Sequence, residues 1–421
     1  GHVVRGSGDD LSCYYYSLSH TDSWHPHNAV GRQVSPALAE ELGGVKGRDY
    51  FMAFRVFGMG DLNAVDLGQA VHEAVLRGEG ALDPKRTLRY GAPLPVSSTW
   101  EGVYIDDYLV VHQLGLREHL SDMRAAEQGE EAGGGREDAQ VLKKVELSYS
   151  KAKLERAEQK SFRFQTQFKA WGAEVDGHRG TVSAATTMRQ QMRRIGIEFI
   201  KGRRATRLIL QKVLGHIAHI FEYKRELFCT CHRIYNFVEE APKRGWFELP
   251  SDILDELRAI VLHLPLAVSN LRAPLSPEVW ATDATPSAGG STSARAHPKV
   301  ISALHRRAEQ RGEPVRLDWN LEDREWSERL TPQNEDIDAL AVSLDWQVTG
   351  EYKFKQTAHV NLQEARAVKR TAVQYAREPR KRGLRQILLC DSRVCVGAFG
   401  KGRSSSYLLN GVLRKALGHF I

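Results

Sequence analysis

The sequence is poor in cysteine, and the few cysteines that it has do not suggest a covalent framework. There are five in 421 residues, an odd number scattered as Cys13, Cys229, Cys231, Cys390 and Cys395. Such a set does not form a disulfide framework, and the pair at 229 and 231 has no second ligand pair at zinc-finger spacing. We therefore expect a reducing compartment and no structural zinc.

Long hydrophobic runs are also missing, as is a strong excess of charge of one sign. No apolar run approaches the roughly 18 residues of a membrane span, and no signal peptide is visible. We therefore expect an intracellular protein, in the cytoplasm or nucleus, with no membrane partner. The 59 basic and 52 acidic residues give a formal charge of +7. This modest excess favours a polyanionic partner without demanding one.

The chain lacks an initiator methionine at its start and a polar tail at its end, so we expect both ends to be cuts through a longer polypeptide. Its length predicts two or three domains. An apolar content of 42% and a charged content of 26% are those of a globular protein. Residues 121–140 are rich in Glu and Gly and predict a flexible insertion, and residues 292–350 read as a second insertion.

The stretch from Val103 to Val111 places two adjacent acids, Asp106 and Asp107, between runs of β-branched and aromatic residues. This pattern predicts a strand, a tight turn at the acids and a second strand. Carboxylates held at the rigid tip of such a hairpin suit Mg²⁺. An ordinary surface turn, where Asp is a favoured residue, is the alternative on this stretch alone.

Two sets of acids at predicted strand ends stand out. In an antiparallel sheet, Asp10 can lie beside the hairpin acids, and three carboxylates can hold two Mg²⁺ (or Mn²⁺) ions about 3.5–4 Å apart. The choice of Asp10 over Asp9 depends on the Leu-Ser that follows it, because a strand turns successive side chains to opposite faces. The second set combines two strand ends and a helix and is also a two-metal pattern; it consists of Asp283, Glu364 and Asp391.

Other segments can be assigned more simply. Residues 49–57 and 161–168 are aromatic-rich and predict strands. The turn Gly58-Met59-Gly60 precedes a helix and would let backbone approach a nucleotide closely. Residues from about 185 to 271 have helical periodicity, and Asn361 is a candidate N-cap for a helix that follows it.

In order, the first 185 residues resemble the palm of a reverse transcriptase. The motifs that carry this resemblance are Asp10-Leu11-Ser12, Tyr15, Gly58-Met59-Gly60, Tyr104-Ile105-Asp106-Asp107, Lys160 and Ala170-Trp171-Gly172. In this family, the aromatic at Tyr15 excludes a 2′-hydroxyl, the turn at Met59 and Gly60 contacts the incoming nucleotide and template, and Lys160 would lie near the triphosphate.

Residues 278–421 resemble the ribonuclease H domain that follows in retroelement polyproteins of the DIRS and LTR types. Three of its four acidic motifs have counterparts here, in Thr282-Asp283-Ala284, in the segment from His359 to Glu364 and in Cys390-Asp391-Ser392. The fourth acid would lie beyond residue 421.

The resemblance implies a combined α+β and α/β fold. A polymerase palm, an antiparallel sheet with helices and partial fingers, would occupy residues 1–185, a helical thumb or connection 186–275, and a ribonuclease H-like mixed sheet with helices 276–421. The activity would be RNA-directed DNA polymerisation on an RNA template and DNA primer with dNTPs, linked to cleavage of an RNA–DNA hybrid. The catalytic and metal-binding residues would be Asp10, Asp106, Asp107, Asp283, Glu364 and Asp391, and the nucleotide-binding residues Tyr15, Met59, Gly60 and Lys160.

Only nine residues precede Asp10, so we expect most of the fingers, whose basic residues grip the triphosphate, to be missing from this stretch. Two alternatives therefore stay open. One is a catalytically inactive retroelement remnant that binds nucleic acid, and the other is a nuclease that acts on RNA–DNA hybrids only. The oligomeric state is not indicated by the sequence.

Overall fold

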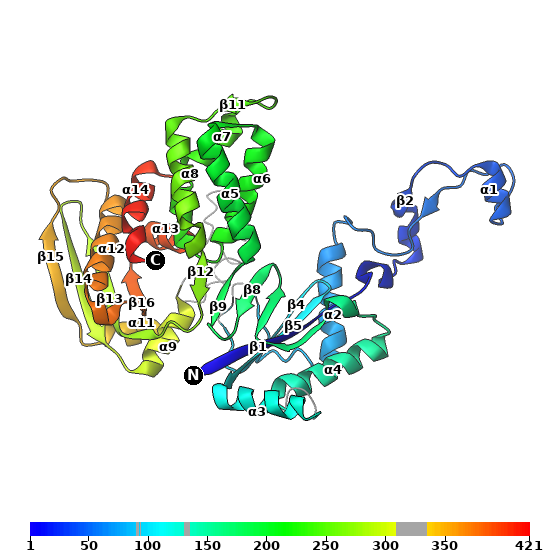
Figure 1. Ribbon diagram of the computed structural model, residues 1–421, viewed down its shortest axis with the longest axis horizontal. Helices are drawn as coiled ribbons and strands as arrows, with labels where there is room; N and C mark the ends of the chain where they lie inside the picture. The colour runs from blue at the N-terminus through cyan, green and yellow to red at the C-terminus, as the bar shows by residue number, and fades with distance from the viewer. Residues whose placement is uncertain (90–91, 93, 130–134, 309–334) are drawn as a thin grey trace. The chain divides into compact units, whose positions relative to one another are not determined.

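The computed structural model describes residues 1–89, 92, 94–129, 135–308 and 335–421. The chain forms two compact units, Gly1–Gly180 and Thr181–Ile421 (Figure 1). The predicted helical segment 186–275 and the predicted domain 276–421 both lie in the second unit, and their assignment as separate domains stays a prediction. No helix among the described residues is both long and apolar enough to cross a bilayer.

The first unit is built on a four-stranded antiparallel sheet in the order β4-β5-β1-β6. The strands are β1 (His2–Asp10), β4 (Thr99–Tyr104), β5 (Asp107–Gly115) and β6 (Phe162–Gln165). The central pair, β1 and β5, is in register along its whole length, from His2 opposite Gly115 to Asp10 opposite Asp107. The strand–turn–strand pattern predicted around Asp106 is thereby confirmed as the β4–β5 hairpin.

Helices cover one face of this sheet. They are α2 (Ala64–Gly78), α3 (Leu116–Glu127) and α4 (Glu137–Ala152), while α1 (Pro36–Glu41) is a further helix of the unit that lies away from the sheet (Figure 1). Apolar side chains of α2 and α4, among them Leu76, Val145 and Tyr149, form one core with Tyr108 and Val110 of β5. The alternation of side chains along β5 therefore gives the sheet one face for these helices.

The remaining strands of the first unit are short. They are β2 (Ala29–Val30), β3 (Met52–Ala53), β7 (Gln167–Ala170) and β8 (Ala173–Asp176). A two-residue turn at Trp171 and Gly172, within the motif Ala170-Trp171-Gly172, joins β7 to β8, and both residues have the positive φ that such a hairpin turn requires.

Three local predictions differ from the structure. The strand predicted over 49–57 is reduced to the two residues of β3, where Phe51, Met52 and Phe54 are exposed, and of its aromatic side chains only that of Phe57 is buried in the core. The strand over 161–168 is split into β6 and β7. The predicted flexible insertion 121–140 is helical up to Glu127 and again from Glu137, while residues 130–134 lie outside the described residues.

A buried arginine ties the sheet of the first unit to its helices. Arg5, on β1, is 2% exposed, and its Nε and Nη2 atoms donate to the two carboxylate oxygens of Asp138 at 2.7 and 2.8 Å. Its Nη1 atom donates to Asp122 of α3 at 2.6 Å, and the guanidinium lies 4.8 Å from the ring centre of Phe164. Three charged groups are thus paired away from water, where an unpaired charge is expensive.

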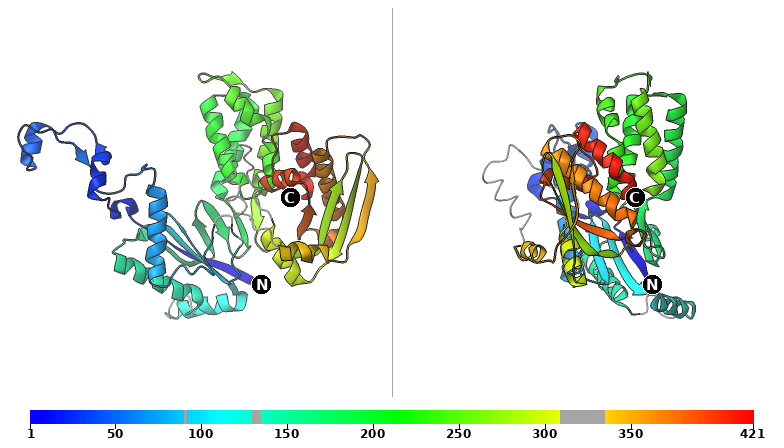
Figure 2. Two further views of the ribbon diagram at one scale, coloured as in Figure 1. Left: turned by 180° about the vertical axis from the view of Figure 1, so that it is seen from behind. Right: turned by 90° about the vertical axis from the view of Figure 1, so that its left-hand side faces the viewer.

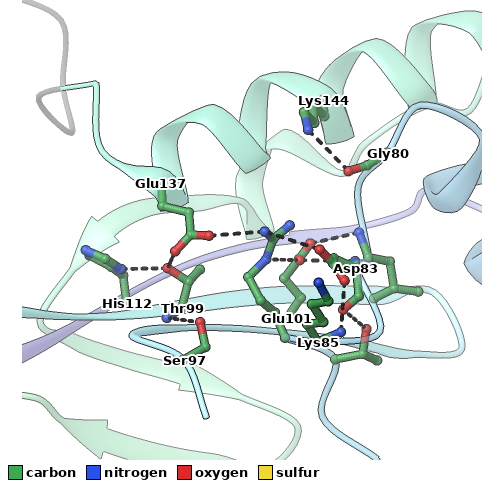
Figure 3. A network of polar contacts seen from close by, with 12 residues as sticks. Gly80, Asp83, Lys85, Ser97, Thr99, Glu101, His112, Glu137 and Lys144 are labelled. Atoms are coloured by element: carbon green, nitrogen blue, oxygen red, sulfur yellow. Dashed lines mark hydrogen bonds and ion pairs between the residues drawn. The ribbon is translucent and has the colours of Figure 1, made fainter. Parts of the chain in front are cut away.

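A second polar network anchors β4, the strand that leads into the acidic hairpin (Figure 3). The fully buried carboxylate of Glu101 accepts hydrogen bonds from the Leu82 amide, from Arg86 Nε and from the Tyr108 hydroxyl. Glu137, on α4, accepts from the Thr99 hydroxyl at 2.6 Å. Glu101 and Glu137 each accept several hydrogen bonds. These bonds stabilise β4 along its outer edge, and its backbone hydrogen bonds to β5 stabilise the other edge.

The second unit combines helices with a mixed sheet (Figures 1 and 2). Its first helices are α5 (Thr186–Gly202), α6 (Arg207–Phe221), α7 (Arg233–Glu240) and α8 (Ser251–His263), accompanied by the short strand pairs β9 (Thr181–Ala184) with β12 (Val268–Asn270) and β10 (Arg204–Ala205) with β11 (Phe247–Glu248). The helical periodicity predicted from about 185 to 271 is confirmed.

The mixed sheet has the order β15-β14-β13-β16, with β13 and β16 parallel. Its strands are β13 (Leu275–Ala284), β14 (Ala288–Arg295), β15 (Gln347–Lys353) and β16 (Arg385–Cys390), and the helices around it are α9 (Pro298–Arg307), α11 (Glu335–Val342), α12 (Val360–Arg377), α13 (Arg393–Lys401) and α14 (Tyr407–Ala416). Much of the predicted insertion 292–350 is therefore regular structure, and residues 309–334 lie outside the described part. The N-cap of α12 is His359, whose Nδ1 accepts from the amide of Asn361, so the prediction that Asn361 caps this helix is wrong.

One hydrophobic core runs through both parts of the second unit. Buried side chains of α6 and α8, such as Leu210 and Leu257, belong to the same cluster as Ala365, Cys395 and Leu413 of the last three helices. The helices and the mixed sheet with its covering helices are therefore stabilised by common packing.

Replacing Arg5 by Met should destabilise the first unit by about 3–5 kcal/mol, because the carboxylates of Asp122 and Asp138 would lose a buried partner. The matched control is Arg77→Met, which removes an exposed pair with Glu73 on α2 and should cost about 0.5 kcal/mol or less. Hydrogen exchange of the β1 and β5 amides measures both changes. Unaltered protection in the Arg5 variant would contradict this account of the network.

Candidate active sites at two sets of strand ends

The first acid cluster forms where the two central strands of the first unit meet the hairpin turn. Asp10 is the last residue of β1 and lies opposite Asp107, the first residue of β5, while Asp106 is the turn residue between β4 and β5. The side chains of Asp10 and Asp107 are within hydrogen-bonding reach of each other. The structure thus brings Asp10 together with two adjacent acids that lie about a hundred residues later in the sequence, as the antiparallel pairing predicts.

The turn that carries Asp106 is held from outside the hairpin. Ile105 has a φ of 58°, which is a strained value for a β-branched residue. The Ile105 amide donates to Gln69 Oε1 at 2.8 Å, and its carbonyl oxygen lies 2.8 Å from His72 Nδ1. His72 is fully buried, and its other ring nitrogen lies 2.8 Å from the Tyr149 hydroxyl. Helix α2 therefore fixes the backbone on which the acid stands.

Asp9 and Asp10 point to opposite sides of β1. Asp9 is 3% exposed, and its Oδ1 atom lies 3.0 Å from Arg163 Nη2. Arg156 Nη1 lies 3.7 Å from the same oxygen. Asp10 turns toward the hairpin, and its carboxylate accepts a hydrogen bond from Lys160 Nζ at 2.8 Å. The geometry places Asp10, and not Asp9, in the acid cluster.

Lys160 and Tyr15 are the two predicted nucleotide-binding residues that the structure brings to this cluster. Lys160 ends a short 3-10 helix (Glu158–Lys160), and the nearby Ala157 amide donates to the Asp10 carbonyl at 2.8 Å. Burial and the nearby carboxylate of Asp106 raise the pKa of the half-buried Tyr15. A Cβ atom on Gly68 of α2 would lie 3.3 Å from the Tyr15 ring, a tight contact, so a larger residue there would require the ring to shift by a few tenths of an ångström.

Met59 and Gly60 are placed differently. Met59 is 83% exposed, and Gly60 has a φ of 114° in the turn that precedes α2. Among the described residues, no contact joins either of them to the three carboxylates. Their predicted role in binding a nucleotide therefore stays a prediction, although the glycine turn and the helix after it are present as expected.

Burial and the neighbouring acids together raise the pKa values of Asp106 and Asp107 in the first cluster. Burial, followed by the carboxylates of Asp106 and Asp10, raises the pKa of Asp107 from 3.8 to about 6. Burial and the Asp10 carboxylate also raise the pKa of Asp106, against the opposing effect of Lys160. Three acids with a single lysine form a site in which a cation would relieve repulsion.

The second acid cluster lies at the end of the parallel pair β13 and β16. Asp283 is the penultimate residue of β13, Asp391 directly follows β16, and Glu364 lies in the second turn of α12. Glu364 is 3% exposed, and its Oε1 atom accepts from the amide of Ala284 at 2.9 Å. The structure therefore brings these three predicted acids together as well.

Burial raises the pKa of Glu364, and the nearby acids Asp391 and Asp283 raise it further. Sequence reasoning did not select Cys390, whose thiol lies 3.9 Å from Glu364 Oε2. Donor atoms of Glu364, Cys390 and Asp391 all lie within 4.8 Å of one another. The signal was present in the sequence, because Cys390 directly precedes a predicted ligand at a strand end.

Both clusters have the oxygen donors that Mg²⁺ and Mn²⁺ prefer. In the first, Asp10, Asp106 and Asp107 would hold the ions. In the second, Asp283, Glu364 and Asp391 would hold them. Carboxylates that converge from separate strands are suited to binding phosphate groups through divalent cations.

Removing the charge of Asp107 should stabilise the metal-free chain at high pH. Because its folded-state pKa is raised, the stabilisation of the protonated form is fully present below about pH 4 and is lost as the pH rises through about 6. Asp107→Asn should therefore gain about 1–2 kcal/mol over the native chain at pH 8, after screening of this partly exposed group is allowed for. The gain should shrink toward pH 4.

Thermal unfolding in EDTA across this pH range measures the difference. Asp66→Asn, an exposed acid on α2, serves as the control and should show no comparable pH-dependent gain. A variant of Asp107 that is no more stable than the native chain at pH 8 would show that the three acids do not repel one another as described.

Comparison with known proteins leaves the family of this chain open. No protein-family model matches the sequence, and no curated protein matches it. The solved structures that it resembles include those of foamy viral protease-reverse transcriptase. One complex with double-stranded DNA is 17% identical (TM-score 0.38), covering 69% of this chain and 40% of that one. The complex with an RNA/DNA hybrid is 12% identical (TM-score 0.40), covering 92% of this chain and 57% of that one.

A second complex of that viral protein with double-stranded DNA is 15% identical, has a TM-score of 0.39 and covers 92% of this chain and 67% of that one. This chain thus spans 40% and 57% of the length of the first two. We therefore base the function proposed below on the two acid clusters and not on these similarities.

Proposed function

We propose that the chain is a nucleic-acid-dependent nucleotidyltransferase, an RNA-directed DNA polymerase, with a second, ribonuclease H-like centre. The observation that carries this proposal is the convergence of Asp10, Asp106 and Asp107 at one end of a sheet, with Lys160 bound to the first of them. These residues come from motifs whose order along the chain already indicated the same activity.

The geometry of the first cluster suits phosphoryl transfer, which requires positioning and charge neutralisation and no nucleophilic side chain. Divalent ions held by the three carboxylates would supply charge stabilisation at the attacking and leaving oxygens. Lys160, 61% exposed at its side chain, can reach a triphosphate without leaving the site. Tyr15 lies beside Asp106, where its ring would face the sugar of a bound nucleotide.

The second cluster suits hydrolysis of a phosphodiester. Asp283 and Asp391 are exposed at adjacent strand ends, so a backbone phosphate can approach them, while the buried Glu364 is oriented by the Ala284 amide. The exposed basic residues Lys201, Arg203 and Arg204 of the same unit would contact phosphates, with binding that weakens as salt rises.

Primer extension tests the polymerase. With Mg²⁺, dNTPs and an RNA template–DNA primer, we expect the full chain to extend the primer, and the double variant Asp106→Asn/Asp107→Asn to lose about 10²–10³-fold in rate, the loss typical of removing transition-state charge stabilisation. Asp66→Asn should keep its rate. Retained duplex binding without any extension by the native chain would favour an inactive nucleic-acid-binding remnant and reject the polymerase.

Cleavage of an RNA–DNA hybrid tests the second centre independently. Asp391→Asn should reduce Mg²⁺-dependent cleavage by about 10²-fold or more, since one carboxylate ligand of the site is removed. The control is Asp345→Asn, an exposed acid in the same unit. Asp391→Asn should leave primer extension unchanged. Hybrid cleavage that survives Asp391→Asn would show that the second cluster is not a nuclease site.

A further inference from the structure

Cys390 occupies a position in the second acid cluster that carboxylates alone do not explain. It ends β16 immediately before Asp391, and its thiol lies 3.9 Å from Glu364 Oε2. One donor atom from each of Glu364, Cys390 and Asp391 falls within 4.8 Å of the others. The thiol comes from the last residue of β16, one carboxylate from the residue after it and the other from α12. The three groups therefore converge on one site.

A neighbouring hydroxyl also lacks a partner. Thr282 lies opposite Cys390 in the parallel ladder of β13 and β16, and residues in register on parallel strands share a face of the sheet. Thr282 is 6% exposed, and its Oγ1 atom has no hydrogen-bond partner among the residues that the structure describes. A buried hydroxyl without a partner is rare, because the loss of its hydrogen bonds to water is not recovered.

The charge of the second cluster is uncompensated in the described part of the chain. No lysine or arginine there forms an ion pair with Asp283, Glu364 or Asp391, whereas Lys160 pairs with Asp10 in the first cluster. Glu364 is a nearly fully buried carboxylate, and a buried acid is ordinarily paired or bound to a cation. The lack of an ion pair in the described part of the chain and the burial of Glu364 both favour a bound cation in the second cluster.

We propose that Cys390 is a metal ligand and that Glu364, Cys390 and Asp391 together bind a thiophilic divalent cation of the Zn²⁺ and Cd²⁺ class. The inference rests on the proposed function only in that it uses the same acids. Mg²⁺ binds oxygen donors and has little affinity for sulfur, whereas Zn²⁺ and Cd²⁺ bind thiolate strongly. Cys390 is therefore a specificity-determining residue for the metal of this centre.

The geometry needs a small adjustment. With Zn–S near 2.3 Å and Zn–O near 2.0–2.2 Å, tetrahedral ligands lie about 3.3–3.7 Å apart, so the three donors must close by about 1 Å. Rotation of the exposed Asp391 side chain can provide most of this. The cation displaces the thiol proton to solvent as the metal–sulfur bond forms, and the Thr282 hydroxyl gains a neighbouring ion or an ion-bound water.

Cadmium titration tests the proposal through the sulfur-to-metal charge-transfer absorption in the ultraviolet, which hard-metal binding does not produce. The protein is the full chain with Cys13→Ser, which removes the exposed thiol. We expect one equivalent of Cd²⁺ to produce a saturable absorption. Cys390→Ser and Cys390→Ala should both abolish it and should weaken Cd²⁺ binding at least about 10-fold, a loss typical of removing one ligand interaction.

The matched control is Cys395→Ala. Cys395 is also close to Cys390, but its Sγ donates to the Asn361 carbonyl at 3.3 Å, so the absorption should remain in this variant. Absorption that survives both Cys390 variants, or that depends on Cys395 instead, would overturn the proposal. Cd²⁺ absorption that depends on Cys390, found together with no hybrid cleavage in Mg²⁺, would support the metal site and reject only the nuclease.

Discussion

The backbone of Ile105 is the constraint on which the first acid cluster depends. A β-branched residue in a left-handed conformation costs about 1–3 kcal/mol, and it persists only where its surroundings hold it. Here Gln69 accepts a hydrogen bond from the Ile105 amide, and His72 Nδ1 lies within hydrogen-bond distance of the Ile105 carbonyl oxygen. The hydroxyl of Tyr149 contacts the other ring nitrogen of His72 and so orients the imidazole. The strain in the turn is thus met by α2 and α4, the two helices that also cover the sheet. The two helices that complete the core therefore also position Asp106.

The two acid clusters use one structural device with different electrostatics. In each, acids at the ends of paired strands meet an acid or a lysine brought by another segment, because neighbouring strand ends are among the few places where carboxylates can converge and still reach solvent. The first cluster includes Lys160, which offsets part of the repulsion. The second has a deeply buried glutamate and a thiol in place of a cation. The first is therefore suited to hard ions and phosphates, and the second can distinguish between hard and soft cations.

Much of the local structure could be predicted because it depends on short-range chemistry. The hairpin around Asp106 and the helices after residue 185 follow from turn residues, strand-forming residues and periodicity. The same reasoning was wrong for Asn361. The side chain of His359, two residues earlier, accepts a hydrogen bond from the amide of Asn361, so His359 is the N-cap. It also overestimated the strand at 49–57, where Phe51 and Phe54 are exposed and only Met52 and Ala53 pair with another strand.

By itself, the sequence determined which acids stand at strand ends and in what order, since local patterns place Asp10, Asp107 and Asp391 at the limits of strands. Only the tertiary structure decided which of them meet and what surrounds them. The register of β1 against β5 places Asp10 opposite Asp107 and turns Asp9 toward Arg163. The parallel pairing of β13 with β16 places Thr282 beside Cys390, and the packing of α12 brings Glu364 to the same point. These contacts join residues 80 to 154 positions apart, and their energies depend on burial and on neighbouring charges that no local pattern contains.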